Sequence, residues 1–171
     1  MTANHITRLN DLIKADFLTL AEETNERNAC ITAGNRLLVS AVMPYYKPSV
    51  SYLTSEHNVE QQADGSYAEI SVELNTVLKS AHGALIHSFA LAHNFCTGGL
   101  LDVEKCLRLS IAVRTTPNFA NLGYIQANLR IFAKNTFDQK HLPSASIYGV
   151  AALPGQTVVN VEAEYQLRNP L

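Results

Sequence analysis

The spacing of apolar residues predicts two helices near the N-terminus. Between residues 6 and 20 apolar side chains recur every three or four positions, as on one face of an amphipathic helix: Ile6, Leu9, Ile13, Phe17 and Leu20. A second helical pattern runs from Ile31 through Val42 and ends before MPYYKP, whose prolines cannot continue a helix. We therefore expect residues 1–43 to form an N-terminal helical segment.

Beyond residue 65 apolar and polar residues alternate, as in strands with one face in solvent. Alternation begins in SYAEISVELN, after the turn sequence ADGS, and it returns in four later stretches: EKCLRLSIAVR, LGYIQANLRIFA, SASIYGVAAL and QTVVNVEAEYQL. Gly and Pro residues separate these stretches. Successive strands at this spacing predict an antiparallel sheet of five or six strands.

The least charged part of the chain lies between the first of these strands and the other four. SAHGALIHSFALAHNFCTGG, residues 80–99, contains three histidines and Asn94 but no Asp, Glu, Lys or Arg. A helix that is apolar on nearly every side must be covered on nearly every side. The sequence therefore predicts an α+β fold in which the sheet curls around a central buried helix, with residues 44–171 and the N-terminal segment forming one compact domain.

Composition argues against several classes of partner. The formal net charge of −2 over 171 residues disfavours broad binding to nucleic acid or to anionic membranes, because both require a basic surface. The three cysteines form no C-x-x-C pair, and the N-terminal sequence lacks the apolar run of a signal peptide. We therefore expect a cytoplasmic protein that binds neither nucleic acid nor membrane.

The start of the uncharged helix offers candidate chemistry. Ser80 suits an N-cap, which would leave the Gly83 amide in the first turn, where free N–H groups can bind a carbonyl oxygen as an oxyanion hole. Alternatively, Gly83 only permits close packing of the helix on the sheet. His82, His87 and His93 stand five, six and eleven residues apart rather than three or four, so we expect no metal site. We also expect no cofactor.

The order of strand, "HGAL" helix and four strands closing with LPGQTVVNVEAEYQL resembles the hotdog fold of 4-hydroxybenzoyl-CoA thioesterase-like and phenylacetate-type acyl-CoA thioesterases. The resemblance covers residues 44 to 168. It implies a hotdog domain over residues 44–171 that pairs into a homodimer or a dimer of dimers. It also implies hydrolysis of an acyl-CoA or acyl-carrier thioester in a pocket at the dimer interface.

Carried onto this sequence, the resemblance puts His82 and Gly83 at the oxyanion-binding helix start. It also puts Arg114 and Thr116, in RTTPN, on the loop that meets the CoA moiety.

The carboxylate that these enzymes place nine residues after the His falls at Leu91, which cannot act as a base or a nucleophile. His87 is then the candidate base for water, and Asn94 the residue that orients it. Two alternatives remain open: a hotdog protein that binds an acyl chain or CoA ester without catalysis, and a cone-shaped binding or isomerase domain of the nuclear-transport-factor-like class.

Overall fold

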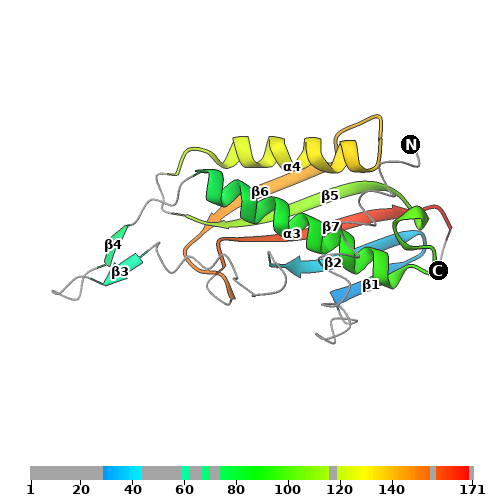
Figure 1. The fold of residues 1–171 in the computed structure, drawn as a ribbon, viewed down its shortest axis with the longest axis horizontal. Helices are drawn as coiled ribbons and strands as arrows, with labels where there is room; N and C mark the ends of the chain where they lie inside the picture. Colours follow the sequence, from blue (N-terminus) through cyan, green and yellow to red (C-terminus); the bar gives the residue numbers. More distant parts are fainter. Residues whose placement is uncertain are drawn as a thin grey trace.

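The computed structural model describes residues 29–43, 59–61, 67–69, 74–115, 119–154 and 157–169 (Figure 1). Their elements follow the order β1 (Cys30–Ala33), β2 (Arg36–Val42), β3 (Val59–Gln61), β4 (Tyr67–Glu69), α3 (Leu74–Phe95), the short 3₁₀ helix η2 (Gly99–Asp102), β5 (Val103–Arg114), α4 (Leu122–Thr136), β6 (Ser144–Val150) and β7 (Val159–Leu167). The helix expected over residues 6–20 lies outside the described residues.

The main sheet has five strands in the order β1-β2-β7-β5-β6. Strands β5 and β6 pair in parallel, whereas the other neighbours pair antiparallel. Parallel neighbours need a crossover connection, and α4 supplies it by packing on both β5 and β6. Strands β3 and β4 form a separate two-stranded sheet.

Both helices cover the same face of the main sheet, and they pack against each other (Figure 1). Alternation along β7 places five buried residues on this face: Val159, Val161, Ala163, Tyr165 and Leu167. From α3, Phe89 enters the same core, with its ring 5.3 Å from that of Phe137 and 6.1 Å from that of Tyr165. No helix among the described residues is both long enough and apolar enough to span a membrane.

The hotdog prediction, with an antiparallel sheet wrapped around one central helix, is wrong. The stretch LGYIQANLRIFA forms most of α4 rather than a strand, and its buried residues, Ile125, Leu129 and then Ala133, recur every four positions. A helix in that place carries the chain back across the sheet, so β6 runs parallel to β5. Within the described residues the result is a two-layer structure, with α3 and α4 on one face of a mixed sheet.

The helix expected over Ile31–Val42 is also wrong, because these residues form the hairpin of β1 and β2. Gly34 opens the turn with φ +63°, a conformation that glycine adopts without a steric penalty. Since β2 pairs with β7, residues 36–42 belong to the main sheet. That the chain forms one compact domain stays a prediction.

Candidate functional site

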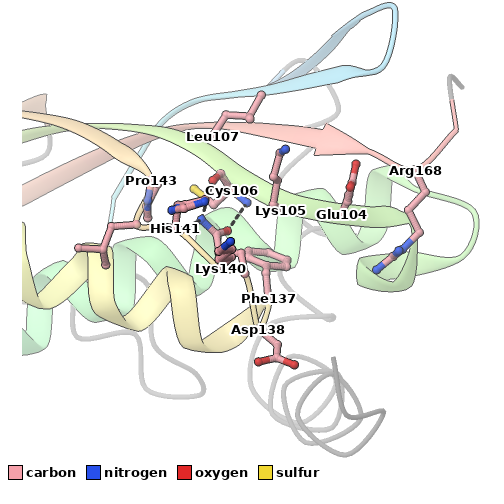
Figure 2. Close-up of a pocket in the computed structure, with 12 residues that line it drawn as sticks. Glu104, Lys105, Cys106, Leu107, Phe137, Asp138, Lys140, His141, Pro143 and Arg168 are labelled. Carbon is pink, nitrogen blue, oxygen red and sulfur yellow. Dashed lines mark hydrogen bonds between the residues drawn. The ribbon is translucent and has the colours of Figure 1, made fainter.

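An open cavity of about 470 Å³ lies where β5 begins, beside the loop that connects α4 to β6 (Figure 2). Residues 104–107 of β5, residues 137–143 of the loop, and Arg168 after β7 line it. Strand β6 begins its pairing with β5 only at Arg108 and Ser144. The cavity therefore lies next to the part of β5 that β6 leaves uncovered.

The end of α4 positions the loop. Asp138 takes a left-handed conformation with φ 48°, which acidic and amide side chains tolerate better than most. The backbone N–H of Gln139 then donates to the Lys134 carbonyl at 3.1 Å, which gives a carbonyl in the last turn of the helix its hydrogen bond. This turn directs the loop back toward β5.

The Gln139 side chain fastens the loop to β5. Its Oε1 accepts from the Cys106 amide at 2.9 Å, and its Nε2 donates to the Cys106 carbonyl at 3.1 Å. The same Nε2 donates to the His141 carbonyl at 2.7 Å. One side-chain amide thus supplies the hydrogen bonds that a neighbouring strand would make to Cys106, and it holds His141 at the cavity.

The Cys106 thiol is unsuited to nucleophilic catalysis at neutral pH. Its residue is 1% exposed, and its Sγ donates to the Arg108 carbonyl at 3.8 Å. Burial raises the pKa of the thiol to about 12, so the thiolate is scarcely populated. The cavity therefore offers charged and polar side chains, but no activated thiol.

The acidic and the basic side chains around the cavity differ in their interactions with the rest of the protein. Glu104 accepts from Gln166 Nε2 at 2.8 Å, and Asp138, whose carboxylate points away from β5 in Figure 2, also has an interaction partner. In the described part of the chain no ion pair joins a carboxylate to any of the three cations: Lys105, Lys140 and Arg168. With three basic and two acidic side chains, the lining carries an excess of one positive charge.

The sequence-predicted catalytic residues do not line this cavity. His87 is buried on α3, with its Nδ1 2.9 Å from the Met43 carbonyl, while Asn94 is exposed near the helix end. Their seven-residue separation places them about 10 Å apart along the axis, too far to share one water. Gly83 is buried inside α3, which begins at Leu74, so its amide belongs to the helix ladder rather than to a free N-terminus.

The predicted substrate-binding residues lie elsewhere too. His82 is half-buried, with its Nδ1 2.9 Å from the Leu78 carbonyl and its ring centroid 5.0 Å from that of Phe132. Arg114 is half-buried at the end of β5, and Thr116 lies outside the described residues. Participation of these residues in binding stays a prediction. Within the described residues no cluster of His, Cys, Asp and Glu could hold a metal ion.

Sequence reasoning missed the loop residues of the cavity. The stretch FDQKHLP, residues 137–143, holds four polar residues in succession between the apolar residues of α4 and a proline. This run of polar residues was the signal available in the sequence. The hydrogen bond between Gln139 and Cys106, however, joins positions 33 residues apart, so no local pattern indicates it.

No family model and no curated protein sequence matches the chain, but solved structures share its fold. A protein of unknown function from Agrobacterium tumefaciens is 16% identical, with a TM-score of 0.65 over 81% of each chain. A candidate endoribonuclease from Shewanella oneidensis is 15% identical, with a TM-score of 0.65 over 81% of this chain and 83% of its own. Escherichia coli TdcF with bound serine is 16% identical, with a TM-score of 0.50 over 82% and 87%.

The E. coli YjgF gene product has the same fold, which we call the YjgF fold. These neighbours overturn the resemblance to hotdog acyl-CoA thioesterases. The predicted acyl-CoA or acyl-carrier thioesterase activity, with its acyl thioester partner, is therefore wrong. The expected homodimer or dimer of dimers rested on the same resemblance and loses its support.

Proposed function

We propose that the chain binds a small polar metabolite in the cavity between β5 and the α4–β6 loop. The observation that carries the proposal is the cavity itself, because its volume of about 470 Å³ falls within the usual range for small-molecule sites, about 300–1,000 Å³. Its walls combine the Phe137 and Leu142 side chains with charged groups from three segments of the chain.

The neighbour TdcF, whose structure contains serine, supports a ligand of this size. Burial raises the pKa of the Cys106 thiol to about 12, so this thiol is a poor nucleophile near neutral pH. His141, exposed at the rim, is the candidate group for proton transfer. A cytoplasmic location remains part of the proposal, consistent with three free cysteines among the described residues.

RNA cleavage is a second candidate function. It is favoured by the Shewanella neighbour, described as a candidate endoribonuclease, and by Lys140 beside His141 at the cavity, since a cation and a histidine suit phosphate binding and proton transfer. Incubation with single-stranded RNA tests it. Cleavage by the wild type that His141→Ala abolishes would support this function, and intact RNA would exclude it.

A ligand-observed NMR screen tests metabolite binding. The protein is mixed with small amino acids, carboxylates, phosphate esters, amines and neutral polyols, and saturation transfer identifies those that bind. Leu142 lines the cavity and is 42% exposed. Leu142→Trp should abolish the saturation-transfer signal, because the larger indole ring would occupy space that the ligand needs. Ile131→Trp is the matched control, since Ile131 on α4 is 50% exposed and does not line the cavity. Binding that survives Leu142→Trp would contradict the proposed site.

A further inference from the structure

We infer that the ligand of this cavity carries an acidic group, a carboxylate or a phosphate, bound by Lys105, Lys140 and Arg168. This inference rests on the proposed function, and it adds the chemical class of the ligand. The three cations come from separate segments: β5, the α4–β6 loop, and the residue that follows β7. Their convergence on one cavity is therefore a product of the tertiary fold.

The first step of the argument is the charge balance of the lining. The cavity is lined by three basic side chains and by two acidic ones, Glu104 and Asp138. Both acidic residues already interact with other groups of the protein. The three basic side chains form no ion pair within the described residues, and three positive against two negative charges leave the lining with an excess of one positive charge.

The second step concerns how each basic group is held. Arg168 Nε donates to the Leu101 carbonyl at 2.9 Å, which fixes the guanidinium group while leaving its terminal nitrogens available to an acidic group. Lys140 follows Gln139, whose side chain binds Cys106 and the His141 carbonyl. The loop lysine is therefore attached to an ordered segment rather than to a free one.

The third step is the dielectric setting. Phe137 and Cys106, at 2% and 1% exposure, are buried apolar residues of the cavity lining. An apolar wall lowers the local dielectric constant and strengthens the attraction between a cation and an acidic ligand. An amine would add to the excess positive charge of the lining, and a polyol would not offset it.

Titration of matched probes tests the inference. Lactate is compared with lactamide, and glycerol phosphate with glycerol, at about 20 mM and about 200 mM NaCl, since exposed charges are screened within about 10 Å at 0.1 M salt. We expect the acidic member of at least one pair to bind about tenfold or more tightly than its neutral partner, and less tightly at high salt. The two pairs distinguish a carboxylate from a phosphate.

Variants link the effect to the named cations. Lys105→Gln, Lys140→Gln and Arg168→Gln should each weaken binding of the acidic probe about three- to tenfold. Lys79→Gln, which changes the same charge on an exposed residue of α3 outside the cavity, should leave it unchanged. Circular dichroism confirms that each variant is folded.

The outcomes separate this inference from the proposed function. A neutral or basic compound that binds in the cavity at least as tightly as the acidic probes, with no salt dependence, overturns the acidic class but leaves the proposed function standing. Absence of binding by every probe, acidic, basic and neutral, overturns both. Acidic binding that is equally weakened by Lys79→Gln also overturns the assignment to these three side chains.

Discussion

Removing the two hydroxyl groups that meet between α3 and β7 tests how α3 is positioned along the sheet. Ser88 Oγ lies 2.7 Å from the Tyr165 hydroxyl oxygen, and both residues are 0% exposed. Tyr165→Phe removes only the phenolic oxygen, because the ring that packs 6.1 Å from Phe89 and 5.8 Å from Phe137 is kept. Ser88→Ala removes the other partner.

The expected magnitudes follow from the buried environment. Each single substitution leaves one buried hydroxyl without its partner, which costs about 1–3 kcal/mol of the free energy of unfolding. Alanine's better helix propensity reduces the cost of Ser88→Ala by about 0.5 kcal/mol. The double variant contains no orphaned hydroxyl, so its loss should resemble that of one single variant. The coupling free energy should therefore equal the loss of the other single variant, about 0.5–3 kcal/mol.

Urea unfolding of the wild type, the two single variants and the double variant measures this coupling. Ser80→Ala is the matched control, because Ser80 is also fully buried on α3 but donates to the Thr76 carbonyl of its own helix at 2.9 Å. Combined with Tyr165→Phe it should be additive within about 0.5 kcal/mol. Additive losses for Ser88→Ala and Tyr165→Phe would refute the contact between the two hydroxyls and the register that it reflects.

Three further predictions concern thiols, backbone and loop. Raising the pH from about 8 to about 11 should lower the free energy of unfolding, because burial raises the pKa of Cys96 to about 11 and of Cys106 to about 12 from 9.0, so the unfolded chain releases protons that the folded chain keeps. A pH series of urea titrations measures this loss, and Cys106→Ala should flatten it. Gly123→Ala should raise stability by about 0.5–1 kcal/mol in thermal unfolding, since an added Cβ meets nothing within 4 Å on this helical residue. Gln139→Leu should speed hydrogen exchange of the Cys106 amide, because leucine cannot accept its hydrogen bond.

Each of these has an opposing result. Stability that is constant or rising across that pH range would mean that the two thiols are not desolvated in the folded state. A loss of stability in Gly123→Ala would show that α4 does not begin as described. Unchanged protection of the Cys106 amide in Gln139→Leu would mean that the loop is not fastened to β5 by this side chain.

Sequence patterns predicted the parts of the fold whose environment is uniform along the chain. The absence of charge between Lys79 and Asp102 indicated a buried helix, and α3 is that helix, although it begins at Leu74 rather than at Ser80. Alternation in QTVVNVEAEYQL indicated a strand with one buried face, and Val159, Val161 and Tyr165 of β7 are buried. When one face of a helix or strand is buried along its whole length, apolar residues recur at a regular spacing. A short stretch of sequence is then enough to predict the element.

The pattern failed where two periods fit the same residues. Ile125, Ala127, Leu129 and Ile131 alternate as in a strand, yet Ile125 and Leu129 also stand one helical turn apart. Only the packing of α4 on β5 and β6 separates these readings, since Ile125 and Leu129 are buried while Ala127 and Ile131 are exposed. Because a strand was predicted there, the helical crossover between β5 and β6 was missed. The parallel pairing of β5 with β6 was missed with it.

The candidate site was decided by tertiary structure alone. The sequence by itself determined which residue types were available, including the polar run of residues 138–141, the buried character of α3 and a net charge near zero. It did not determine that Gln139 would bind Cys106, or that Arg168 would join Lys105 and Lys140 at one cavity. These contacts join residues far apart in the chain, and hydrogen bonds and charge interactions depend on distances that only the packed chain establishes.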